Sequence, residues 1–148
     1  MSSKIPVGYI DIRVFAHATE DPDKVLMAVR NVLPTELAEN IAFKKTSLTG
    51  HYGNPILLFE TRIKDKKFFQ AAFEKLSAGL NALDRETLSN EIERHVENGN
   101  LYIRLNKQSA YHGEVRLSNI DPIHLKIHFK KHGVKEIVEI CRKLGLIR

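Results

Sequence analysis

Residues 123–130 read IHLKIHFK, a strict alternation of apolar and basic side chains. Successive side chains of a β-strand point to opposite faces of a sheet, so this period of two predicts a strand over residues 123–129. The apolar side chains would be buried on one face, and the other face would carry His124, Lys126, His128 and Lys130. A sheet face of this kind, apolar behind and cationic in front, suits a polyanion, of which RNA is the commonest.

Positive charge is concentrated in the part of the chain around this strand. Residues 1–99 contain 13 Lys and Arg against 14 Asp and Glu, whereas residues 100–148 contain 10 against 4. The C-terminal third therefore carries a net charge of about +6, and it also holds four of the seven histidines. A basic segment of this kind favours an acidic partner.

Length and composition narrow the class of protein. A chain of 148 residues is most simply one domain, over residues 1–148, and is long enough to bury a sizeable core. No apolar run approaches the roughly 18 residues that a membrane-spanning helix needs, and the first residues resemble no signal segment. The single cysteine, Cys141, is expected in the core and has no partner for an internal disulfide, which favours a reducing compartment. We therefore expect a cytoplasmic protein without membrane contact.

Turn and capping residues divide the chain into strands and helices. Strands are predicted over residues 7–17, 43–49, 56–63, 101–106 and 123–129. Helices are predicted from Asp21-Pro22 to Pro34, after Asp65, from Asp84 to Gly99, and over residues 134–144 before Gly145. Residues 114–117 are either a short strand or an extended loop. The order β-α-β-β-α-α-β-(β)-β-α predicts an α+β fold, a mainly antiparallel sheet with helices on one face.

The sheet face without helices is the first candidate site. Its predicted side chains are Tyr9, Arg13, Phe15, Tyr102, Arg104, His124, Lys126 and His128. Aromatic rings interleaved with cations stack on unpaired bases while the cations neutralise phosphates. The alternative is that the rings pack under a loop or against a second subunit, because open sheet faces are also dimer interfaces. The ribonucleoprotein octapeptide of the RNA-recognition motif is absent, so that particular fold is not expected.

Two turn-rich segments are the second candidate site. Residues 50–55 follow a strand that begins with two lysines, and residues 107–113 follow the strand at 101–106. Glycines allow close approach of a nucleic-acid backbone, and Lys, His and Asn side chains contact phosphate or ribose. The candidate RNA contacts are Lys44, Lys45, His51, Tyr52, Asn54, Lys107, Gln108 and His112. The alternative is that both segments are tight connections whose polar residues face water.

Catalysis and metal binding have little support in the chain. His124, His128 and His132 recur at a spacing of four, which on a helix would suit a metal ion. On a strand, residues four apart lie roughly 13 Å apart, too far for one zinc ion. We therefore expect no catalytic residue, no metal and no cofactor, and a metal-free nuclease using His51 or His112 stays open as an alternative.

Five short segments carry a family resemblance. They are the strand at 9–15, Asp21-Pro22, residues 49–55, Lys107-Gln108 and residues 121–123 with the sequence Asp-Pro-Ile. Together they resemble the archaeal family of predicted exosome-associated RNA-binding proteins, and the resemblance covers nearly the whole chain. It implies a fold similar to that of the large-subunit ribosomal protein that carries 5S RNA, and it implies the exosome or ribosomal particles as partners.

The combined expectation is a non-catalytic RNA-binding protein that serves RNA processing or ribosome assembly. The basic third, the sheet face and the loops support RNA binding, and the resemblance supplies the cellular context. The first alternative is a homodimeric scaffold that uses the open sheet face for self-association. A nucleic-acid-processing enzyme is the second alternative.

Overall fold

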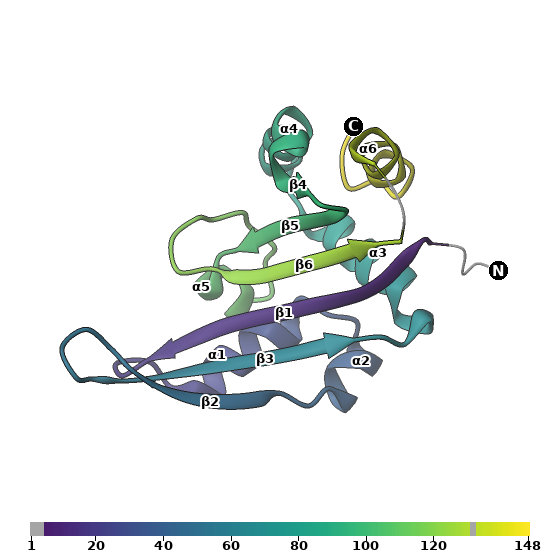
Figure 1. The fold of residues 1–148 in the computed structure, drawn as a ribbon. Helices are drawn as coiled ribbons and strands as arrows, with labels where there is room; N and C mark the ends of the chain where they lie inside the picture. The colour runs from purple at the N-terminus through teal and green to yellow at the C-terminus, as the bar shows by residue number, and fades with distance from the viewer. Residues whose placement is uncertain (1–4, 131–132) are drawn as a thin grey trace.

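A computed structural model describes residues 5–130 and 133–148, so Lys131 and His132 lie outside the described residues. Over these residues an antiparallel sheet has the strand order β2-β3-β1-β6-β5-β4 (Figure 1). The strands are β1 (Val7–His17), β2 (Lys44–Thr49), β3 (Pro55–Ile63), β4 (Val96–Glu97), β5 (Asn100–Leu105) and β6 (Ile123–Phe129). The stretch that alternates between apolar and basic residues is β6, and it lies at the centre of the sheet between β1 and β5.

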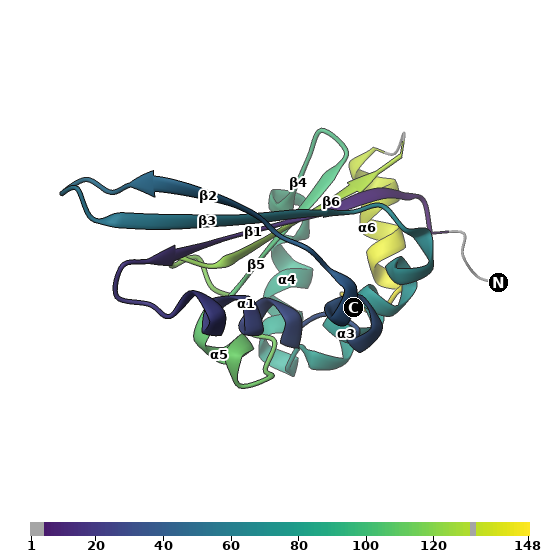
Figure 2. The same ribbon diagram turned by 90° about the horizontal axis from the view of Figure 1, so that it is seen from below.

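Helices cover one face of this sheet. They are α1 (Pro22–Asn31), α2 (Thr35–Asn40), α3 (Phe69–Gly79), α4 (Ala82–Glu91), α5 (Lys107–Tyr111) and α6 (Val134–Lys143), with short 3-10 helices η1 (Lys66–Phe68) and η2 (Ile92–His95). Figure 2 shows α1, α3 and α5 on the same side of the sheet, and Figure 1 shows α4 and α6 at its β4 edge. The α+β fold with an open sheet is thus confirmed. Of the helices in the described ranges, none has the length and apolar character to cross a membrane.

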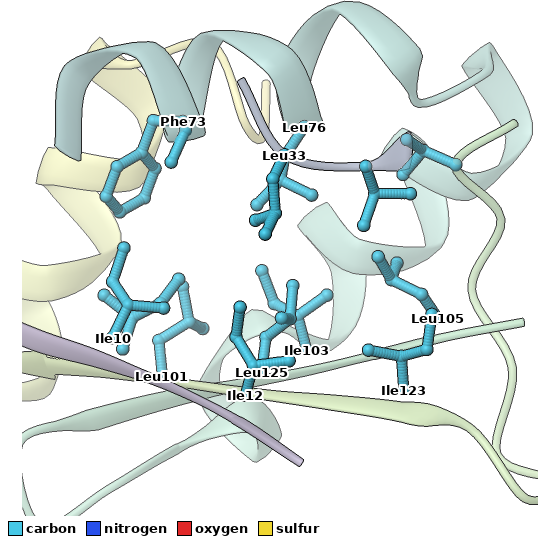
Figure 3. Close-up of a cluster of buried hydrophobic side chains, with 14 of the residues drawn as sticks. Ile10, Ile12, Leu33, Phe73, Leu76, Leu101, Ile103, Leu105, Ile123 and Leu125 are labelled. Atoms are coloured by element: carbon cyan, nitrogen blue, oxygen red, sulfur yellow. The ribbon is translucent and has the colours of Figure 1, made fainter. Parts of the chain in front are cut away.

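The alternation in the strands produces the core. In β6 the inward side chains of Ile123, Leu125 and Ile127 are at most 3% exposed. Figure 3 shows the inward residues of β1, β5 and β6 facing Phe73 and Leu76 of α3. Burial of one such side chain stabilises the folded state by roughly 1.5–3 kcal/mol. The inward residues therefore stabilise the fold, and the outward residues of the same strands remain accessible to a partner.

The predicted helix from Asp84 to Gly99 is correct only as far as Glu91. Its first part is α4, capped by Asn81, whose side chain accepts a hydrogen bond from the Asp84 N–H at 2.7 Å. The chain then passes through η2 into β4, which pairs with β5 across Asn98-Gly99. Both turn residues have left-handed backbones, with φ of 53° and 80°. This two-residue turn is the one that Asn-Gly favours between paired strands.

Residues 107–111 were also predicted as a loop, and they form the short helix α5. Asn106 caps it by accepting a hydrogen bond from the Ser109 N–H at 2.8 Å. The Asn31 side chain of α1 donates to the carbonyls of Ala110 and Tyr111, so α5 lies against α1 in the helical layer. The segment 114–117, left open between strand and loop, is extended and forms isolated bridges to Leu80 and Leu105. The short α2 had no counterpart among the predicted elements.

Cys141 is fully buried on the inner face of α6. Burial disfavours the charged thiolate and raises the pKa of Cys141 to about 12. Its expected place in the core is therefore confirmed.

Candidate nucleic-acid interface

The sheet face that carries no helix in Figure 1 is the open face. A groove of about 800 Å³ lies on it, lined by side chains from β2, β3, β1, β6 and β5. Its charged and polar lining consists of Lys44, Glu60, Thr61, Arg62, Asp11, Arg13, His124, Lys126, Tyr102 and Arg104. Five of these residues are Lys or Arg and two are carboxylates, so the groove has a positive net charge.

Strand pairing places five groove residues in one line across the sheet, the central row. Lys44 of β2 is paired with Glu60 of β3, and Glu60 is also paired with Arg13 of β1. Arg13 is paired with His124 of β6, and His124 with Arg104 of β5. Neighbouring strands are about 4.8 Å apart, so the central row spans about 19 Å from Lys44 to Arg104. Residues from five separate strands thus form one continuous band.

Two arginines of the central row are available to an anion. In the part of the chain that the structure describes, no carboxylate lies within 4.0 Å of Arg13 or Arg104. Their backbones are two strands apart, at about 10 Å, with His124 between them. A phosphate above His124 would lie within reach of both guanidinium groups, whose planar forks match phosphate oxygens.

His124 responds to this environment. Its partial burial, followed by the charges of Arg13 and Arg104, lowers the pKa of His124, and the Asp121 carboxylate acts in the opposite direction. The imidazole is therefore mainly neutral at neutral pH. A neutral imidazole has one donor and one acceptor nitrogen and adds no charge to the two arginines.

Tyr9 is enclosed by its neighbours on the open face. The His128 ring of β6 stacks on it, with 4.7 Å between ring centroids and 16° between planes. The Arg62 guanidinium of β3 lies 3.8 Å from the Tyr9 ring centre, from the opposite side of β1. Arg62 also donates two hydrogen bonds to Asp11, at 2.7 and 2.9 Å, which raise the pKa of Arg62. Both faces of the Tyr9 ring are therefore occupied within the protein.

The remaining aromatic side chains of the open face are also partly covered. Arg13 lies over the Phe15 ring at 6.0 Å, and both Phe15 and Tyr102 are half-buried. Tyr102 is paired with Lys126, and both line the groove. His128 is held by Asn100, whose side-chain oxygen lies 2.9 Å from His128 Nδ1. The open face thus presents cations more readily than bare rings.

The loop at residues 50–55 lies at the tip of an arm formed by β2 and β3. Figure 2 shows this arm extending past the end of β1 and past the helices. His51, Tyr52 and Asn54 are all exposed at the tip, and Tyr52 is 91% exposed. Of the two lysines in β2, Lys44 lines the groove, whereas Lys45 is on the other face because successive strand residues alternate.

Lys107 lies in an internal network. Its ammonium group is 2.8 Å from the Phe15 carbonyl, 3.0 Å from Glu20 Oε1 and 2.7 Å from Asp121 Oδ2. The Lys107 side chain is only 11% exposed. His17 lies 3.1 Å from Asp121 and completes the group. Ligand atoms of His17, Glu20 and Asp121 come within 4.8 Å of one another, but the cation between the two carboxylates is Lys107 itself.

The second candidate surface is therefore divided, because residues 50–55 lie at the tip of the β2–β3 arm and residues 107–113 lie in or beside α5. Gln108 and His112 are exposed on or beside α5, within the helical layer and away from the open face (Figure 2). Lys130 is exposed at the end of β6. Asp11, Glu60 and Arg62 are groove residues that the sequence interpretation missed. They occupy outward positions of β1 and β3, and only the pairing of these strands shows that they belong to the site.

Comparison with known proteins gives one consistent result. A family model described as RNA binding matches residues 9–129. An RNA-binding protein of Pyrococcus abyssi is 39% identical over 139 residues, covering 92% of this chain and 90% of that protein. A DUF54-family crystal structure from Archaeglobus fulgidus is similar with a TM-score of 0.78 and 25% identity, over 93% of this chain and 99% of that chain. A DUF54 protein from Methanothermobacter thermautotrophicus gives a TM-score of 0.75 and 29% identity, over 96% and 98% of the two chains.

Proposed function

The chain belongs to this RNA-binding family, and on that premise we propose that it binds RNA through the open face. The observation that carries the proposal is the central row, in which Arg13 and Arg104 flank His124 without carboxylate partners among the described residues. Lys44 and Lys126 add charge to the same groove. These cations would contact phosphates, which gives affinity and orientation with little dependence on base sequence.

Counterion release supplies the driving force for this mode of binding. Each phosphate neutralised by Lys or Arg releases bound cations, with a slope of log affinity against log salt of roughly −0.7 to −0.9 per contact. The Asp11 carboxylate repels phosphate only weakly, because it forms an ion pair with Arg62 at 2.7 Å. The Glu60 carboxylate lies between Lys44 and Arg13 in the central row and reduces the repulsion between these two cations.

The test is the double variant Arg13→Ala with Arg104→Ala, titrated with labelled RNA over a range of salt concentrations. We expect weaker binding and a salt slope that is smaller by about 1.4–1.8, because two phosphate contacts are lost. Arg94→Ala is the matched control, since Arg94 is an exposed arginine in η2, away from the groove. Unchanged affinity and slope in the double variant would show that the open face is not the RNA-binding surface.

We also infer that RNA is bound without being cleaved and that the protein acts in RNA processing or ribosome assembly. The family resemblance supports this role and names the exosome or ribosomal particles as partners. Gel analysis of RNA after long incubation tests the first part, since shortened products would contradict it. Co-sedimentation with purified exosome or ribosomal subunits tests the second part.

Self-association through the open face is the competing role. Two copies facing each other would bring Arg13, Arg104 and Lys126 close to the same residues of the partner copy, and like charges oppose such contact. Light scattering on the free protein and on the double arginine variant separates the two roles. A dimer that becomes stronger when the arginines are removed, with no change in RNA binding, would favour the scaffold.

A further inference from the structure

Tyr9, Phe15 and Tyr102 of the proposed RNA surface are all half-buried, whereas the tip of the β2–β3 arm carries an aromatic side chain that is almost fully exposed. Tyr9 is covered by Arg62 and His128, at 3.8 and 4.7 Å. Tyr52 is 91% exposed and belongs to the loop that joins β2 to β3. Figures 1 and 2 show this loop at the end of the arm. Base stacking requires an accessible ring face, which Tyr52 offers and Tyr9 does not.

We infer that Tyr52 stacks on an unpaired base while the open face contacts phosphates, so that the preferred ligand is an RNA helix flanked by unpaired nucleotides. This inference rests on the proposed function. A helix keeps its bases inside and presents phosphates, which suits a face of cations whose aromatic rings are half-buried. An unpaired nucleotide presents a π-face, which suits the tip.

Backbone hydrogen bonds close the turn at the tip. The Gly50 N–H donates to the Asn54 carbonyl at 2.7 Å, and the Gly53 N–H donates to the Gly50 carbonyl at 3.0 Å. Gly53 has a left-handed backbone with φ of 81°. A Cβ at Gly50 would lie 2.8 Å from Asn54 Oδ1, so a larger residue there would collide with the Asn54 side chain. An ordered turn reduces the entropy lost when Tyr52 binds a partner.

The charge of the arm also favours RNA as the partner. Residues 44–63, which form the arm, contain two lysines, one arginine and one histidine against a single carboxylate, Glu60. His51 lies beside Tyr52, with 4.8 Å between ring centroids and the two planes nearly perpendicular. A cationic arm with an exposed ring would attract a polyanion and repel a second copy of this basic arm.

The length of the arm sets the size of the ligand. Lys44 is in the central row, and the tip begins six residues further along the chain at Gly50. At about 3.3 Å per residue, Lys44 and the start of the tip at Gly50 are roughly 20 Å apart. An A-form RNA helix of about seven base pairs covers this distance, at roughly 2.8 Å for each pair. An RNA that engages both sites therefore needs at least that much helix beside its unpaired nucleotides.

The test compares three RNAs with the complete protein. They are a blunt 12-base-pair duplex and the same duplex with a two-nucleotide overhang at the 5′ or 3′ end, carrying 2-aminopurine in the overhang. We expect one overhang RNA to bind about 5- to 150-fold more tightly than the blunt duplex, with quenching of the 2-aminopurine fluorescence. Tyr52→Ala should lose the preference and the quenching, Tyr52→Phe should keep both, and Leu83→Ala, at another exposed apolar residue, should match the wild type.

Each outcome has a distinct meaning. If the duplexes bind in an arginine-dependent way but Tyr52→Ala keeps the overhang preference, the inference is wrong and the proposed function stands. If Tyr52→Ala weakens all three RNAs equally, the tip contacts the helix backbone, and stacking on an unpaired base is wrong. If no RNA binds the wild type at low salt, the proposed function itself is wrong. Urea unfolding of Tyr52→Ala should show an intact fold, because Tyr52 is 91% exposed.

Discussion

Replacing Lys107 with methionine should destabilise the fold while leaving the RNA-binding surface in place. The ammonium group contacts the Phe15 carbonyl, Glu20 and Asp121, all within 3.0 Å. These contacts join the end of β1 to the first residue of α5 and to the segment before β6. Methionine keeps most of the length of the side chain but removes the charge and all three hydrogen bonds.

The expected loss in the free energy of unfolding is about 2–4 kcal/mol. A hydrogen bond to a charged group contributes about 1.5–3 kcal/mol, and removal of one partner from a buried ion pair costs about 3–5 kcal/mol. The side chains of Glu20 and Asp121 are 31% and 37% exposed, so water compensates for part of the loss. For a domain of this size the midpoint of thermal unfolding should fall by about 5–15 °C.

The pH dependence gives a second readout of the same variant. Burial acts to raise the pKa of Asp121, but hydrogen bonds from Lys107 and His17 outweigh it and lower that pKa. A carboxyl group with a lowered pKa in the folded state contributes stability above its unfolded pKa, near 4, and loses it as the pH falls further. The difference in stability between wild type and Lys107→Met should therefore be full at pH 7 and shrink below about pH 4.

Urea unfolding at several pH values measures both quantities, with Lys66→Met as the matched control because Lys66 is exposed at the start of η1. A change below about 0.5 kcal/mol in Lys107→Met, similar to that of a surface substitution, would refute the structural role of the network. A stable Lys107→Met protein that loses RNA binding would instead return Lys107 to the RNA contacts.

Two further predictions concern β6. RNA affinity should rise as the pH falls from 7.5 to 5.5 at constant ionic strength. The charges of Arg13 and Arg104 help to lower the pKa of His124, and a phosphate bound by these arginines offsets their charges, so RNA binding favours the protonated imidazole. His124→Gln should remove this dependence, and an equal pH dependence in both proteins would contradict it. Leu125→Ala should reduce the free energy of unfolding by about 2–5 kcal/mol, since Leu125 is 3% exposed in the core, whereas Lys126→Ala should change it by less than about 0.5 kcal/mol; comparable losses in urea unfolding would mean that the two faces are assigned wrongly.

The strands were predictable because one of their faces is buried. In β1 and β6 the period of two determines both the secondary structure and the side of each residue, and these assignments agree with the structure. The region from residue 84 to 99 was not predictable in the same way. Leu88, Ile92 and Val96 have helical spacing, but the Asn98-Gly99 turn and pairing with β5 place Val96 in β4. A local pattern was overridden there by contacts with a neighbouring strand.

The site was predictable only as far as single strands determine it. The outward positions of Arg13, Arg104 and Lys126 follow from alternation, and the structure brings these residues together in the groove. The enclosure of Tyr9 depends on Arg62, and nothing local shows that β3 pairs with β1 in a register that places Arg62 opposite Asp11. The network of Lys107 likewise depends on distant parts of the chain, because Phe15 and Glu20 precede Lys107 by 92 and 87 residues.

The buried thiol described above makes this protein well suited to chemical labelling. Cys141 is the only cysteine, it is fully buried, and burial raises its pKa to about 12. Maleimides and disulfide reagents react with thiolates, so the native protein should stay unmodified at neutral pH and react only when α6 opens. A cysteine introduced at Thr49, an exposed residue at the end of β2, would then carry a fluorophore on the arm without competing background. The distance from the arm to a labelled RNA end becomes measurable in solution with the natural cysteine left in place.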